Sequence, residues 1–195
     1  MGPLLEDELP QPSSDVSQLV SMLPFGMAGL TNPEKHREIM DSLFNFLPPY
    51  PRATTLCETY MENSAWIFRP ISREELIDET LVPVYAHAKT RNQATQENEE
   101  VSPHILAVLF MVFAHGALTD LTLPAYNSEA ENYFHLGRLA LSLRSVLDLA
   151  SPQTLQAICL MACYHSNSGR RYTLDSAWLL ISLASKMAQG VSSVL

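Results

Sequence analysis

Cysteine and histidine side chains offer this chain its most obvious potential for chemistry, and the closest pair is Cys159 and Cys163. Four residues apart on a helix, their Cβ atoms would lie about 6 Å from each other, too far for ordinary disulfide geometry. A zinc ion would need both thiolates and further ligands, but His165 projects away from the direction of Cys163. We therefore interpret both cysteines as small hydrophobic residues of a buried helix.

The histidines show no arrangement typical of catalysis. His104 and His115 stand near the two ends of one apolar segment, and His135 falls on the polar face of another. General acid–base catalysis needs an acid or a nucleophile fixed beside the histidine, and the sequence indicates none. Neither a phosphate-cradling glycine loop nor a nucleophile elbow occurs. We predict that the chain is not an enzyme and has no catalytic, cofactor-binding or metal-binding residues.

Two further pairs of residues allow both a structural and a functional interpretation. Arg170 and Arg171 could contact phosphate, but cations are also favoured at the helix C-terminus that precedes them. Trp66 and Trp178 could line a groove for a ligand or a partner. We interpret both tryptophans instead as aromatic anchors of the core.

Helix-start signals recur along the chain and indicate the elements that position these residues. They are either a capping side chain followed by proline, or a capping box, whose two ends satisfy each other's free backbone amides. The signals stand at 32–34, 72–75, 102–103, 128–131 and 151–152. Four acidic residues fall within the two boxes, and we assign them to helix starts rather than to a metal-binding set: Glu74, Glu75, Glu129 and Glu131.

Apolar side chains follow each start at helical spacing, and runs that alternate as strands do are nearly absent. The helix after 72–75 is expected to be interrupted at Pro83. The helix after 151–152 is apolar on all sides, and a helix at about 174–189 offers small alanines for close packing. We expect this hairpin, 151–189, to organise the remaining chain. The predicted fold is all-α, with stacked helical hairpins around a buried core and no β-sheet.

Composition sets limits on the class of protein. The 195 residues are 47% hydrophobic and 17% charged, which is typical of a globular chain. A net charge of −9 disfavours direct attraction to DNA. The longest apolar run, Ile105 to Ala114, is far shorter than the roughly 20 residues of a membrane span. Three cysteines without paired spacing fit a reducing intracellular compartment.

The predicted domain organisation has two parts. Residues 1–17 are acidic and proline-rich, and we expect a flexible N-terminal segment there, followed by a short amphipathic helix at 16–23. Residues 18–195 form the helical domain. Within it, 89–100 contains a single apolar residue, Ala94, and is expected to be a mobile loop.

Two blocks of residues, taken in order, carry a resemblance to a known family. The first comprises Leu56, Tyr60, Trp66, Pro70-Ile71 and the run 102–118. The second comprises Tyr133-Phe134, Leu139, Ala140, 151–156, Gly169-Arg170, Ala177-Trp178, Ala184 and Ala188-Gln189. Over residues 40–190 the chain resembles the fungal-specific transcription factor domain, the middle homology region of fungal zinc-cluster transcription factors.

The resemblance implies an all-α regulatory domain of a nuclear regulator of DNA-templated transcription that acts through protein contacts. The family's zinc cluster uses six cysteines in a basic segment, which this chain lacks, and the family continues with further helices after the position of Gln189. We therefore expect a partial regulatory domain that holds no cofactor, has no membrane partner and reaches DNA only through a separate zinc-cluster segment. The alternative is a free-standing all-α interaction adaptor without a transcriptional role.

Self-association is a further expectation from the sequence. If later helices are missing, the alanine-rich face of the last helix, with Leu183 and Met187 beside it, would stay uncovered. Exposed apolar patches above a few hundred Å² tend to drive association. We therefore expect the chain to pair with itself or with another protein.

Overall fold

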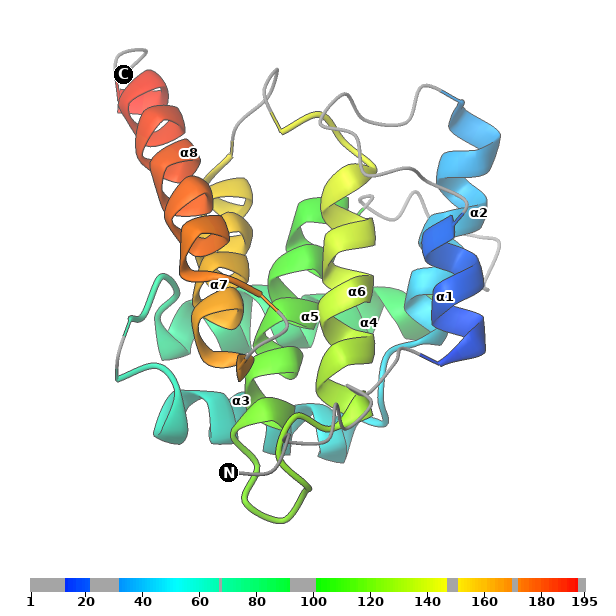
Figure 1. Ribbon diagram of the computed structural model, residues 1–195. Helices are drawn as coiled ribbons and strands as arrows, with labels where there is room; N and C mark the ends of the chain where they lie inside the picture. The colour runs from blue at the N-terminus through cyan, green and yellow to red at the C-terminus, as the bar shows by residue number, and fades with distance from the viewer. Residues whose placement is uncertain are drawn as a thin grey trace.

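The computed structural model describes residues 13–21, 32–66, 68–91, 101–146, 151–169 and 172–192. Every regular element within these ranges is helical, which confirms the all-α prediction (Figure 1). The elements are α1 Ser14–Ser21, α2 Pro33–Asn45, α3 Tyr50–Asn63, the π-helix η1 Glu75–Leu81, α4 Val82–Thr90, α5 Pro103–Leu118, α6 Ser128–Ser142, α7 Pro152–Asn167 and α8 Leu174–Ser192.

Helix α5 lies at the centre of the fold and packs against α3, α6 and α7 (Figure 1). Of its residues only Ile105 and Leu118 are not fully buried. A helix that is apolar on every side must be enclosed by other elements. The expectation that the hairpin 151–189 organises the chain is therefore wrong: α7 packs on α5, whereas α8 lies at the edge of the molecule and packs on α7.

The α7–α8 hairpin itself has the predicted packing face. Ala177 and Ala184 are buried, and Leu160 of α7 is buried as well. Leu183 and Met187 also pack against the core. The alanine-rich face is thus covered within the chain, so the expectation that it would stay exposed is wrong. The expected self-association itself stays a prediction.

Most helix starts have the predicted caps, and two differ in detail. The Asn32 side chain accepts hydrogen bonds from the amides that begin α2, and Ser151 forms a complete capping box with Thr154. The Ser72 hydroxyl accepts the Glu75 amide at 3.1 Å, so only one half of that box forms. The predicted box at 128–131 is wrong, because Asn127 caps α6 with a side-chain oxygen 2.8 Å from the Ala130 amide.

The predicted interruption at Pro83 is seen as a change of helix type, because η1 ends at Leu81 and α4 begins at Val82 with Pro83 in its first turn. Residues Glu75–Leu81 form a π-helix, and the Val82 amide donates to the carbonyl oxygen of Ile77, five residues earlier. Proline has no backbone N–H to donate, so it breaks the regular hydrogen-bond series of an α-helix. The wider π turns stand directly before the proline, and α4 follows them without an intervening loop.

Several predicted boundaries fall partly outside the described residues. Of the segment 1–17, residues 1–12 are not described, and 14–17 belong to α1, which begins at Ser14 rather than at 16. Of the loop 89–100, residues 92–100 are not described, and Lys89 and Thr90 end α4. Helix α3 begins at Tyr50, and Pro51 lies in its first turn.

Close packing of α3 against α5 depends on Gly116. A Cβ atom at this position would overlap the Leu56 carbonyl oxygen and lie 2.9 Å from its carbonyl carbon. Backbone atoms in the middle of a packed helix cannot move away at low cost, so the absence of a side chain sets the distance between these two helices.

We expect Gly116→Ala to lower the free energy of unfolding by about 3 kcal/mol, because it forces α3 away from α5. Gly190→Ala is the matched control: it also lies in a helix, and a Cβ there would have nothing within 4 Å. That variant should gain about 0.5 kcal/mol from helix propensity alone. Urea unfolding followed by circular dichroism measures both variants, and equal effects would contradict the close contact.

Candidate functional site

His104 fastens the N-terminal end of α5 to α6 and α7. Its Nε2 lies 3.2 Å from the carbonyl oxygens of Leu141 and Arg144, and its Nδ1 lies 2.7 Å from the Thr154 hydroxyl. Carbonyl oxygens only accept hydrogen bonds, so Nε2 carries the hydrogen and Nδ1 accepts from the threonine. Every hydrogen-bonding group of this fully buried ring is therefore occupied within the fold.

His115 has the same role at the C-terminal end of α5. Its Nε2 donates to the carbonyl oxygen of Leu160 at 3.0 Å, and its Nδ1 accepts from the Ser64 hydroxyl at 3.2 Å. It therefore links α5 to α7 and to the C-cap of α3. The two histidines lie near helix ends as predicted, and both are buried structural groups.

Burial lowers the pKa of both α5 histidines, because it disfavours the charged imidazolium. For His115 the pKa falls to about 4, and the hydrogen bond to the Leu160 carbonyl opposes this only in part. Both rings are therefore neutral at neutral pH. Enclosed and fully hydrogen-bonded, they are poorly placed for proton exchange with a substrate.

Glu131 lies in the first turn of α6, as its assignment to a helix start implies, but its carboxylate is buried. Its Oε2 accepts from the Tyr164 hydroxyl at 3.2 Å, and its Oε1 accepts from the Tyr172 hydroxyl at 3.1 Å. His135 Nε2 lies 3.1 Å from the same Oε1. The expectation that no acid joins a histidine is therefore wrong for His135, and the spacing of four residues was the signal available in the sequence.

Stacked rings surround this carboxylate. Phe134 stacks on Tyr164 with centroids 4.3 Å apart, and His165 stacks on Tyr172 at 4.1 Å. Burial, and secondarily the charge of Arg138, lowers the pKa of His165 to about 4. The cluster thus binds α6, α7 and the residues before α8 into one unit. The Glu131 side chain is only 4% exposed, so its carboxylate holds the cluster together and is poorly accessible to a substrate.

The three cysteines are free thiols. Burial raises the pKa of Cys57 to about 12, and burial together with the neighbouring Cys159 raises the pKa of Cys163 to about 11. At neutral pH these groups are therefore protonated, whereas nucleophilic attack and metal ligation both need the thiolate. The interpretation as small hydrophobic residues fits this environment, although Cys159 and Cys163 are half-buried rather than fully buried.

Two further features are absent from the described residues. No group of three or more His, Cys, Asp or Glu side chains in these ranges could hold a metal ion. No helix in the same ranges has both the length and the apolar character needed to cross a membrane. Arg170 and Arg171 lie outside the described residues, so their two interpretations stay predictions.

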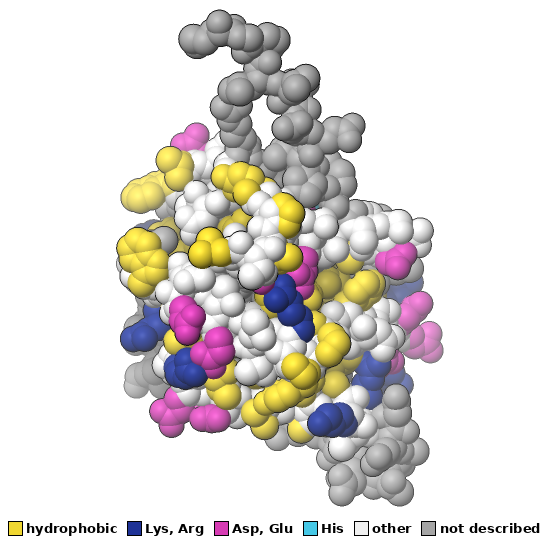
Figure 2. All heavy atoms as spheres, turned by 90° about the horizontal axis from the view of Figure 1, so that it is seen from below, with side chains coloured by type: hydrophobic (Ala, Val, Ile, Leu, Met, Phe, Trp, Pro, Cys, Tyr) yellow, Lys and Arg dark blue, Asp and Glu magenta, His cyan; other side chains and the backbone are white. Residues whose placement is uncertain are grey.

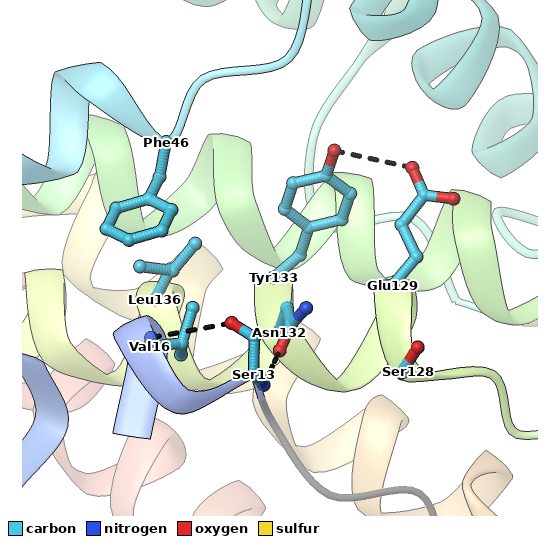
Figure 3. A pocket seen from close by; sticks show the side chains of 8 residues that line it. All are labelled: Ser13, Val16, Phe46, Ser128, Glu129, Asn132, Tyr133 and Leu136. Carbon is cyan, nitrogen blue, oxygen red and sulfur yellow. Dashed lines mark hydrogen bonds between the residues drawn. The ribbon is translucent and has the colours of Figure 1, made fainter. Parts of the chain in front are cut away.

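A groove lies where α1 crosses α6 beside the end of α2 (Figure 3). The amide of Ser13 donates to the Asn132 side chain at 2.7 Å, and the Tyr133 hydroxyl lies 3.4 Å from Glu129. Glu129 is also engaged by Arg52 at 2.8 Å, in an ion pair that ties α3 to α6. The polar groups of this groove therefore serve internal contacts. Apolar side chains fill much of the remaining wall: Val16, Phe46 and Leu136.

Trp66 is 77% exposed, so its interpretation as a core anchor is wrong. Its indole nitrogen donates to the carbonyl oxygen of Asn63 at 3.0 Å, which holds the ring over the end of α3. Phe68 is exposed beside it. Together they form a shallow, open patch, whose other members are Met61, Ala65 and Arg69.

Trp178 is 72% exposed on α8, so it is not a core anchor either. Leu174 and Leu179 are 74% and 69% exposed on the same helix. At 100° per residue, Trp178 and Leu179 flank the polar strip that contains Asp175, on the side of the helix away from its buried alanines. That spacing was readable in the sequence. This exposed apolar face of α8 is the strongest candidate for a functional surface.

Comparison with protein families, with curated proteins and with solved structures finds no match to this chain. The resemblance to the fungal regulatory domain therefore stays a prediction.

Burial of the histidines should make the free energy of unfolding depend on pH. Above pH 6.5 His115 is neutral in both the folded and the unfolded chain. Below pH 6.5 its imidazole takes up a proton in the unfolded chain, whereas in the folded chain it does so only near pH 4. The free energy of unfolding should therefore fall as pH drops through this window, by up to about 1.4 kcal/mol per pH unit for each such histidine.

We expect His115→Gln to reduce the slope of the free energy of unfolding against pH by the amount that one proton contributes. The Gln amide can still donate to the Leu160 carbonyl but does not titrate. Urea unfolding at several pH values between 7.5 and 4.5 provides the measurement. The two proteins should differ little in slope at the upper end of the range, which serves as the control. An unchanged slope in the acidic range would show that His115 is accessible to protons in the folded state.

Proposed function

We propose that this chain is a regulatory domain of a nuclear transcription regulator of the fungal zinc-cluster type, and that it acts through protein contacts. The observation that carries the proposal is the exposed apolar face of α8, formed by Leu174, Trp178 and Leu179. Large apolar side chains gathered on one exposed helix face are characteristic of interaction surfaces, in which tryptophan often contributes most of the binding energy.

The position of the resembling residues supports the transcriptional part of the proposal. The first block falls on the segment from α3 to α5, and the second on α6, α7 and α8. Both blocks include residues that build the central packing, among them Leu56 and Phe134. The resemblance therefore concerns the framework that presents α8, and not only one short motif.

The internal use of polar groups supports a function without catalysis. Glu131, His104 and His115 are buried side chains of types that could take part in acid–base chemistry, and each is hydrogen-bonded within the fold. A catalytic site needs such groups to reach a substrate. We accordingly assign the function of the described residues to their surface.

Any contact with DNA would belong to a separate zinc-cluster segment. The net charge of −9 opposes binding to a polyanion. Basic and acidic side chains are interspersed among the described residues on the face that Figure 2 shows, with hydrophobic patches between them. Phosphate contacts require cations gathered along one surface.

A tethering experiment tests the proposal. The chain is fused to an unrelated DNA-binding domain in a fungal cell, with the cognate site placed before a reporter gene. We expect a severalfold change in reporter output, and we expect the double variant Trp178→Ala with Leu179→Ala to lose most of it. Trp66→Ala, which removes an equally exposed tryptophan elsewhere, is the matched control and should keep the change.

A fusion that reaches the nucleus at the normal level and leaves the reporter unchanged would contradict the transcriptional role. It would favour the alternative, an all-α interaction adaptor. A change that survives the double variant would show that the face of α8 does not carry the function.

A further inference from the structure

The exposed side of α8 carries a single stripe of side chains. Its members recur every three or four residues, as on one face of a helix. They are Asp175, Trp178, Leu179, Ser182, Lys186 and Gln189, all exposed. Because α8 lies at the edge of the molecule and packs on α7, the whole stripe is accessible to another protein (Figure 1).

Charge is distributed unevenly along this stripe. Asp175 stands at its N-terminal end and Lys186 toward its C-terminal end, with the apolar pair Trp178 and Leu179 between them. Among the described residues neither charged group forms an ion pair. An acid at one end and a base at the other make the stripe complementary to its own reversed copy.

We propose that the partner of this face is a second copy of the chain, paired through α8 in antiparallel orientation. The inference rests on the proposed function, because it names the partner of the surface that carries it. A two-fold axis beside residues 180 and 181 places Asp175 opposite Lys186 of the partner subunit, and the symmetry repeats this pair. A parallel arrangement would set like charges against each other, which is unfavourable.

The centre of the stripe fits the same arrangement. Ser182 is small, and its hydroxyl donates to the Trp178 carbonyl oxygen at 2.8 Å, so it needs no further partner. In the antiparallel pair, Leu179 of each copy lies opposite this small side chain on the other, and the indole of Trp178 lies next to it. Such a contact is closed by its two-fold axis and forms dimers rather than fibres. One helix face buries less than the roughly 800 Å² per partner of a standard interface, so we expect micromolar affinity.

The first test is the concentration dependence of mass for the full chain, by sedimentation or light scattering. We expect a monomer–dimer equilibrium in the micromolar range. Trp178→Ala should raise the dissociation constant at least about 30-fold, as expected for a central tryptophan. Trp66→Ala, the matched control, should leave the constant unchanged.

The second test uses charge reversal to examine orientation. Asp175→Lys and Lys186→Asp should each weaken the dimer about tenfold at low salt, since each turns two attractive pairs into repulsive ones. The double variant should recover the original affinity. An equimolar mixture of the two single variants should form heterodimers, because all cross-pairs are then attractive. Circular dichroism checks that every variant is folded.

Three results would overturn the inference. They are a monomer at all concentrations, a dimer insensitive to Trp178→Ala, and a dimer in which the double variant fails to recover. A monomer whose Trp178 fluorescence resists quenchers, measured in a Trp66→Phe background, would show that another part of the chain covers the face. If the chain is monomeric while the reporter effect still needs Trp178, the proposed function stands and the second copy is excluded as partner.

Discussion

The complete burial of α5 is the constraint on which the rest of the structure depends. An apolar helix without a solvent face needs neighbours on every side, and its ends need partners for their free backbone and side-chain groups. His104 and His115, near its two ends, fasten these neighbours by hydrogen-bonding to α6, α7 and the end of α3. Gly116 allows α3 to approach closely enough to cover the remaining side.

Placement of α5 at the centre decides which elements are left to contact other proteins. Helix α7 is used to cover α5, and the buried Glu131 cluster fixes α7 to α6. Helix α8 then packs on α7 through its alanines and has no second layer above it among the described residues. Its exposed tryptophan and leucines follow from this peripheral position. The buried centre and the proposed interaction surface are therefore separate parts of the same stack of helices.

Local sequence signals predicted the helices well, because caps and apolar spacing act within a few residues. Asn32, Ser102 and Ser151 each cap the helix that they were expected to cap. Contacts between residues far apart in the sequence were harder to predict. Glu131 is buried because two tyrosines 33 and 41 residues away donate to it, and no local pattern indicates such partners. Trp178 was misplaced because its size suggested the core, although its helical spacing pointed to the exposed side.

Native-state hydrogen exchange of backbone amides tests the central claim most directly, because it ranks the helices by the free energy needed to open them. On this account, the amides of α5 exchange only through global unfolding, at a free energy equal to that from urea titration. The amides of α8 exchange faster, through local opening of an edge helix. Exchange of α5 before α8, or protection of α8 equal to that of α5 in the monomer, would contradict the separation of a central helix from a peripheral contact helix.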